Sequence, residues 1–151
     1  MLAKYENMTR NPPVYFFFNK QSFSLPNRRT LKSFIISMFK KENVLLGEIR
    51  YVFCSDKELL RLNKQFLNHD YLTDIITFDF SNDKIKKLAE VYISIDRVRD
   101  NSKIFQVSFS QEIHRVIFHG VLHLCGYSDK SKKEKAKMTE KENFYLKKYF
   151  T

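Results

Sequence analysis

The sequence predicts an α/β or α+β protein in which helices cover a small β-sheet. Three observations support this fold class. Short β-prone runs alternate with segments of helical periodicity, one helix is apolar on nearly every side, and no internal repeat or long linker divides the chain. With 151 residues, 43% of them hydrophobic, residues 1–151 are expected to fold as a single domain.

The first part of the chain predicts a strand followed by an amphipathic helix. Residues 1–12 are polar, and we expect them to form a flexible lead-in, while residues 14–18 are a β-prone run. Ser24 and Pro26 suit a helix start. Basic residues cover the outer face of this helix, and they indicate either a solvated surface or an RNA-contacting one: Arg28, Arg29, Lys32, Lys40 and Lys41.

The middle of the chain predicts three strands and one helix. The strands are expected at residues 46–54, 74–80 and 89–95, and the helix at residues 55–67. Ser55 and Glu58 would form a capping box at the start of this helix. Residues 68–70 are predicted to be a turn, and residues 81–88 a polar loop.

The last part of the chain predicts three helices, at residues 95–105, 108–124 and 132–149. Ser108 would cap the second helix, and Ser131 with Glu134 makes a capping box for the third. Four hydrophobic residues are expected on the inner face of the third helix: Met138, Phe144, Tyr145 and Tyr149.

The helix at 108–124 is the predicted centre of the domain. Its broad apolar stripe consists of Ile113, Val116, Ile117, Gly120, Val121 and Leu124, and Phe118 and Leu122 lie nearly opposite. A helix that is apolar on both sides is usually buried. Four polar residues share the narrow strip that remains: Glu112, Arg115, His119 and His123. The two histidines are therefore expected at one edge of a buried helix, where a cleft could open.

His119 and His123 are spaced to share a cation. Residues four apart on a helix lie one turn apart on the same face. Gly126 then offers a helix stop, and Asp129 is free to fold back toward the histidines. Two imidazoles and a carboxylate suit zinc or a similar ion with one position open for water. The alternative is that the histidines are hydrogen-bonded core residues and that Asp129 caps the next helix, although Ser131 already serves that purpose.

Composition limits the partners and the location. The formal net charge of +10 suggests a polyanionic partner such as nucleic acid or an anionic membrane, the alternative being a solvated lysine-rich surface. Cys54 and Cys125 are expected to be reduced, and Cys125 lies about 200° round the helix from His123, so we do not expect it to be a ligand. The polar N-terminus and the lack of a ~20-residue apolar run predict a soluble, cytoplasmic protein.

The run H-G-x-L-H-L-x-G-Y from His119 to Tyr127, followed by a third ligand, resembles the signature of the YbeY family of bacterial metal-dependent endoribonucleases. The resemblance covers roughly residues 45–130 and implies a compact α+β domain with a mixed four-stranded sheet. It also implies one divalent metal ion, zinc being expected, held by His119, His123 and Asp129. The family usually has a third histidine at position 129, so the aspartate here alters the charge of the site.

A second stretch, residues 63–78, resembles the family pattern N-x-x-[FY]-R…T-[DN]-V-L-[ST]-F. Leu67 stands where many members carry an arginine thought to contact RNA phosphate, and leucine cannot do this. Three alternatives follow: Lys64, His69 or Arg61 substitutes for the arginine, catalysis is weaker, or the arginine is not needed. Thr73 and Asp74 match the family's cleft-lining pair, so we expect Thr73, Asp74 and Lys64 to bind substrate. From the residues alone, the better interpretation of Thr73 and Asp74 is a turn and a strand start.

The motif offers no side-chain base. Gly120 occupies the place of the glutamate in the H-E-x-x-H motif of metalloproteases, which argues against peptidase chemistry and leaves no obvious side-chain base. The expected catalytic group is a metal-bound water, and the base is either the metal hydroxide itself or a group of the substrate. Glu112 is either a partner that orients His119 or an ion-pair partner of Arg115. His114 faces away from the ligands and is interpreted as structural, and His69 is expected to be solvent-exposed.

Three functions remain open. The first, implied by the resemblance, is a single-strand-specific endoribonuclease in ribosomal RNA maturation, including the 3′ end of 16S rRNA, and in ribosome quality control. Its partners would be rRNA and the small ribosomal subunit, with neither DNA nor membrane expected. The second is an RNA-binding ribosome-assembly factor with a structural metal. The third is a metal hydrolase that acts on another substrate.

Overall fold

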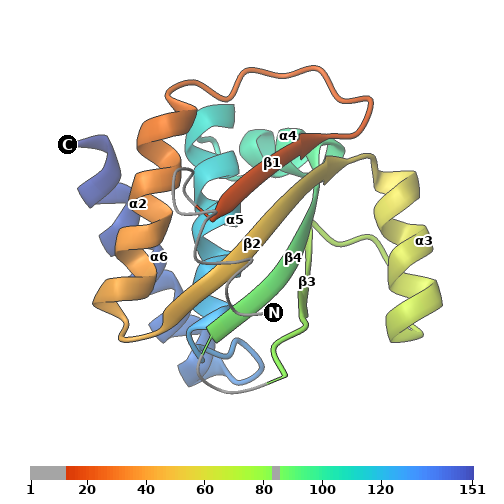
Figure 1. Ribbon diagram of the computed structural model, residues 1–151. Coiled ribbons are helices and arrows are strands. Elements are labelled where there is room, and N and C mark those ends of the chain that lie inside the picture. The colour runs from red at the N-terminus through yellow and green to blue at the C-terminus, as the bar shows by residue number, and fades with distance from the viewer. Residues whose placement is uncertain (1–12, 83–85) are drawn as a thin grey trace.

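A four-stranded mixed sheet lies between helices on its two faces in the computed structural model, which describes residues 13–82 and 86–151 (Figure 1). The strands are β1 (Val14–Phe18), β2 (Leu45–Cys54), β3 (Ile75–Asp79) and β4 (Lys86–Ser94). Their order in the sheet is β1-β2-β4-β3, in which β1, β2 and β4 are parallel and β3 is antiparallel to β4. The expected α+β fold with a mixed sheet of four strands is confirmed.

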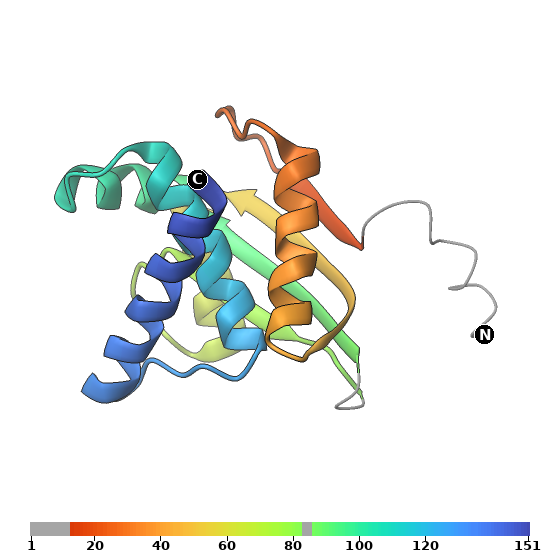
Figure 2. The same cartoon turned by 90° about the vertical axis from the view of Figure 1, so that its left-hand side faces the viewer.

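Five helices are described: α2 (Arg28–Lys41), α3 (Asp56–Leu67), α4 (Ile95–Ile104), α5 (Phe109–Leu124) and α6 (Lys132–Phe150). Figure 2 shows α2, α5 and α6 over one face of the sheet, with α5 between the other two. Helix α3 lies on the opposite face (Figure 1). In the described ranges, no helix combines the length and the apolar character that crossing a membrane requires.

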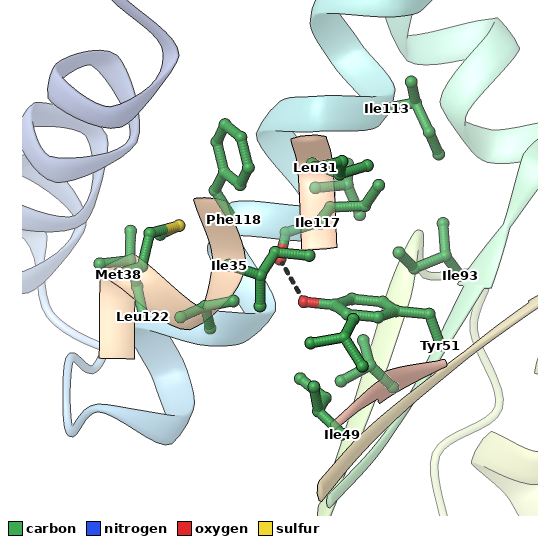
Figure 3. Packing of buried hydrophobic residues seen from close by; sticks show 14 of the residues in the cluster. Leu31, Ile35, Met38, Ile49, Tyr51, Ile93, Ile113, Ile117, Phe118 and Leu122 are labelled. Atoms are coloured by element: carbon green, nitrogen blue, oxygen red, sulfur yellow. Dashed lines mark hydrogen bonds between the residues drawn. The ribbon is translucent and has the colours of Figure 1, made fainter. Parts of the chain in front are cut away.

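The main core fills the space between the sheet and helices α2, α5 and α6. Alternate residues of β2 and β4 face these helices, and they are fully or almost fully buried: Ile49, Tyr51, Phe53, Ala89, Val91 and Ile93. Tyr51 reaches from β2 to α5, and its hydroxyl donates a hydrogen bond of 3.1 Å to the Ile117 carbonyl (Figure 3). Helix α5 is buried on both sides, as its sequence predicts.

Helix α5 approaches the sheet closely because Gly120 faces it. A Cβ atom at position 120 would lie 3.2 Å from side-chain atoms of both Ile75 and Val91. The glycine therefore brings the helix against β3 and β4. His123, on the polar strip one turn further along α5, consequently lines the same cleft as residues of β3.

The structure corrects three expectations from the sequence. Strand β4 begins at Lys86, so the prediction of a polar loop over residues 81–88 is wrong for its last three residues. Lys86 pairs with Leu45 in the sheet, and this pairing uses backbone hydrogen bonds, which do not depend on the polarity of the side chain. Helix α2 begins at Arg28, after Asn27 in a left-handed conformation, not at Ser24 or Pro26. Phe144 is exposed and lies against the Lys41 ammonium instead of facing inward. The predicted lead-in, residues 1–12, falls outside the described residues.

The helix caps are largely those that the sequence predicts. The side chains of Ser55, Ser108 and Ser131 each accept a backbone hydrogen bond at the start of α3, α5 and α6. Ser131 and Glu134 form the full reciprocal capping box, whereas at Ser55 only the serine half is present. Ser94 also caps α4, and this cap was not among those predicted from the sequence.

Glu42 ties the end of α2 to α6 and to the connection before it. Its carboxylate accepts hydrogen bonds from the hydroxyls of Tyr127 and Tyr145, at 2.9 and 2.5 Å, and from Lys141 Nζ at 3.1 Å. Burial alone would raise the pKa of Glu42, but these three donors outweigh it and hold the pKa below the ordinary value of 4.5.

We expect Glu42→Gln to lower the free energy of unfolding at pH 7 by about 2 kcal/mol, because hydrogen bonds to a charged carboxylate are lost. The folded-state pKa is lowered, so this stabilisation is present above the ordinary glutamate value of 4.5 and is lost as the pH falls through the folded-state pKa. Urea unfolding at several pH values would measure the difference. A difference that stays constant down to pH ~3 would contradict the assignment.

Candidate metal centre

His119 and His123 project from the polar edge of α5 and their ring centroids lie 4.4 Å apart. After α5, Gly126 adopts a φ of 100° and turns the chain back, as its position predicts. This turn brings Asp129 to the histidines. Its Oδ2 atom lies 3.5 Å from His119 Nε2 and 3.4 Å from His123 Nε2.

Each imidazole is held through its other nitrogen. His119 Nδ1 lies 2.8 Å from Glu142 Oε1, and His123 Nδ1 lies 2.9 Å from the Tyr127 carbonyl oxygen. A carboxylate and a carbonyl can only accept a hydrogen bond, so in both rings Nδ1 carries the proton and donates it. In the neutral rings, both Nε2 lone pairs then face Asp129.

Three acceptor atoms thus converge, and a ligand atom from each residue lies within 4.8 Å of the other two. The separations of 3.4 and 3.5 Å are long for direct hydrogen bonds. They match the edge of about 3.3–3.4 Å that a tetrahedron with zinc–nitrogen bonds of about 2.0–2.1 Å has. The donor set of His119, His123 and Asp129 therefore fits zinc or a similar divalent ion, which would relieve the repulsion among the three acceptors.

A buried charge network supports the His119 side of the site. Arg115 donates to Glu112 at 2.6 Å, to Glu142 at 3.0 Å and to Asp74 at 3.4 Å. Burial alone would raise the pKa of Glu142, but the hydrogen bond from His119 and the charge of Arg115 hold it below the usual range. Of the two predicted roles for Glu112, the ion pair with Arg115 is the one observed.

The residue that orients His119 is Glu142, which no motif in the sequence predicts. It comes from α6, 23 residues after His119. One signal was present: Glu142 falls between Met138 and Tyr145 on the inner, apolar face of α6. A carboxylate in such a position needs a partner, and here it has both His119 and Arg115.

A cleft of about 690 Å³ opens beside the triad of His119, His123 and Asp129. Residues that precede or belong to β3 line it together with the end of α3: Asn63, Leu67, His69, Tyr71, Thr73, Asp74, Ile75, Ile76, Thr77 and Asp79. Leu124 and Lys130 complete the lining. Thr73 and Asp74 therefore lie in one cleft with the triad. Lys64 does not line it and pairs with Asp70 at 3.2 Å on the exposed side of α3.

Cys125 lies within the motif but outside the triad. Its side chain packs against the main core, where burial raises the pKa of the thiol to about 12. Both Cys54 and Cys125 are free. Cys125 therefore packs against the core and is not one of the grouped candidate ligands, in agreement with its predicted position on the helix.

His114 faces away from the ligands, as predicted, and is buried against Phe118, Tyr149 and Phe150. Its Nδ1 lies 2.6 Å from the Ser110 carbonyl, and in the described structure its Nε2 has no hydrogen-bond partner. Burial lowers the pKa of His114 below the ordinary value of 6.5, since the charged form is disfavoured in these surroundings.

We expect His114→Phe to change the free energy of unfolding at pH 7.5 by less than about 1.5 kcal/mol and to leave metal binding intact. The folded-state pKa of His114 is lowered, so the wild type loses stability as the pH falls from 6.5 through the folded-state value. The variant should lack this loss. Urea unfolding at pH ~7.5 and ~5.5 measures both quantities, and an equal loss in the two proteins would contradict the prediction.

The fold and the site define a class: a small α+β domain whose central helix presents two histidines, with a carboxylate from the following loop, to a shared point beside a cleft. The chain belongs to the Endoribonuclease YbeY family, whose model matches residues 17–150.

Relatives agree with this assignment, and a solved structure shares the fold. The chain is 45% identical over 133 residues to an endoribonuclease YbeY from Cytophaga hutchinsonii, covering 88% of this chain and 93% of that protein. It is 41% identical over 133 residues to one from Amoebophilus asiaticus, covering 88% and 90%. The solution structure of a Thermotoga maritima protein matches with a TM-score of 0.61 and 25% identity over 91% of this chain and 89% of that chain.

Proposed function

We propose that this protein is a metal-dependent endoribonuclease that cuts single-stranded RNA during ribosomal RNA maturation, including the 3′ end of 16S rRNA, and in ribosome quality control. The observation that carries the proposal is the convergence of His119 Nε2, His123 Nε2 and Asp129 Oδ2 beside an open cleft. The relatives named endoribonucleases supply RNA as the substrate class. The protein would act in the cytoplasm on rRNA or the small ribosomal subunit, with no DNA or membrane partner.

In this proposal, His119, His123 and Asp129 would hold one divalent ion, and zinc fits the two-imidazole, one-carboxylate donor set. When bound, such an ion supplies Lewis-acid chemistry, acidifying a water molecule and polarising a phosphoryl oxygen. Glu142 and the Tyr127 carbonyl fix the ring orientations and keep the proton on Nδ1 of each histidine.

The cleft positions the substrate in this proposal. Thr73 and Asp74 lie in the lining, so an RNA strand along β3 would pass them and reach the triad. Asp74 also contacts Arg115, which connects the lining to the carboxylate that orients His119. No side chain is assigned as the general base.

A second function is an RNA-binding ribosome-assembly factor whose metal ion is structural. Leu67 favours it, because this cleft residue cannot hold a phosphate or stabilise an anionic transition state. A hydrolase that acts on another substrate is a third. Salt-sensitive RNA affinity would support either RNA-directed function over the third.

The test is cleavage of a labelled single-stranded RNA by the purified protein as isolated, after chelation, and after return of zinc. Cleavage that disappears on chelation and reappears with the ion, but is absent on the matching duplex, would support the endoribonuclease. Equal cleavage in all three samples would identify a contaminating nuclease. Stoichiometric metal binding and RNA binding without cleavage would favour the assembly factor.

A further inference from the structure

His69 and Tyr71 form an exposed aromatic pair at the rim of the cleft. Their rings are stacked, with centroids 5.1 Å apart and planes 22° from parallel. The Tyr71 hydroxyl lies 2.9 Å from His69 Nδ1, so the two side chains hold each other. Tyr71 is nevertheless 56% exposed, which leaves ring surface open to another partner. Both residues line the cleft that contains the triad.

The backbone under this pair is fixed rather than loosely placed. Asn63 is buried at the end of α3, and its side-chain amide donates a hydrogen bond of 3.0 Å to the Tyr71 carbonyl. Its own carbonyl accepts a hydrogen bond of 3.1 Å from the His69 amide. Asn68, with a φ of 54°, makes the left-handed turn that ends α3 just before His69. The aromatic pair is thus held in place before any ligand arrives.

The charged residues that line the cleft do not favour phosphate binding at this rim. Among the described lining residues, Lys130 alone is cationic, against Asp74, Asp79 and Asp129. Leu67 at the rim is uncharged, and Lys64 nearby is already paired with Asp70. At this rim of the cleft, apolar and aromatic surface is therefore the main surface that an RNA strand would meet.

We propose that the His69–Tyr71 pair is a base-binding subsite, on which one unpaired nucleobase of the RNA stacks while a neighbouring phosphate lies at the triad. This inference rests on the proposed function, and it gives a physical reason why the protein would select single-stranded RNA over duplex RNA. Every base offers a flat aromatic face, so stacking binds RNA with little dependence on sequence. A base inside a duplex is already stacked on both sides and is not available to Tyr71.

The chain contains no tryptophan, which permits a direct test. The variant Tyr71→Trp places a single indole at the subsite, and Phe105→Trp places one at a site that is equally exposed, at 56%, and outside the cleft lining. Both proteins would be freed of metal by chelation and titrated with an oligouridylate or with an abasic ribose-phosphate strand of the same length. We expect saturable fluorescence quenching only for Tyr71→Trp with the oligouridylate. Equal responses to the two strands would overturn the proposal.

A second measurement uses the loss of the ring. Tyr71→Leu should weaken oligouridylate binding by roughly fivefold or more, while Tyr71→Phe and the control Phe105→Leu should bind like the wild type. Unchanged binding by Tyr71→Leu, with normal cleavage, would overturn the base-binding subsite and leave the proposed function standing. A wild-type protein that neither binds nor cuts RNA would overturn both proposals.

Discussion

Replacing His123 by alanine should remove the bound divalent ion and lower single-stranded RNA cleavage by roughly a thousandfold, since Lewis-acid catalysis is worth several kcal/mol. The substitution deletes His123 Nε2, one of the three converging ligand atoms, which lies 3.4 Å from Asp129 Oδ2. The fold should persist, because the His123 side chain is partly exposed and lies outside the buried apolar stripe of α5.

The measurements are metal content by elemental analysis, cleavage rate and circular dichroism on the same preparation. His114→Phe is the matched control, since it removes a histidine of the same helix that faces away from the triad. A folded His123→Ala protein that still binds one ion and cuts RNA at the wild-type rate would show that the triad is not the catalytic centre.

Glu142→Ala should have the second largest effect, and on two quantities at once. It should lower the free energy of unfolding by about 3 kcal/mol, because Arg115 loses one of its buried carboxylate partners. It should also weaken metal binding by roughly 10- to 100-fold, because His119 loses the acceptor that fixes its ring. Chemical denaturation of the metal-free protein and a zinc titration would measure the two effects separately.

Glu140→Ala is the control for this substitution. Glu140 lies on the same helix, its side chain is 70% exposed, and its ion pair with Lys137 is long at 3.6 Å. It should change neither quantity by more than about 0.5 kcal/mol. Glu142→Gln keeps a hydrogen-bond acceptor for His119 without the charge, so it should lose stability but retain more of the metal affinity than Glu142→Ala. Unaltered zinc affinity in Glu142→Ala would contradict the orienting role.

Local patterns predicted most of the fold. The apolar stripe of α5, the stop at Gly126 and the serine caps each depend on residues close together in the chain, and each is observed. The start of β4 was missed because Lys86 joins the sheet through backbone hydrogen bonds, which a polar side chain neither reveals nor prevents.

The candidate site was predictable only where its parts are near in sequence. The short sequence separation of His119, His123 and Asp129 predicted that they converge. The pairing of His119 with Glu142, in contrast, depends on how α6 packs against α5. The joining of Thr73 and Asp74 to the same cleft likewise depends on where β3 lies beside α5. Such juxtapositions follow from tertiary packing, which periodicity in a single sequence does not specify.

The contact between α5 and α6 also sets an order of events during synthesis. A growing chain that has reached Asp129 already carries all three candidate ligands, but the carboxylate that orients His119 is not yet made. The ring becomes fixed only when α6 has emerged and docked. A chain shortened before α6 would therefore hold an ion less tightly than one in which α6 lies against α5.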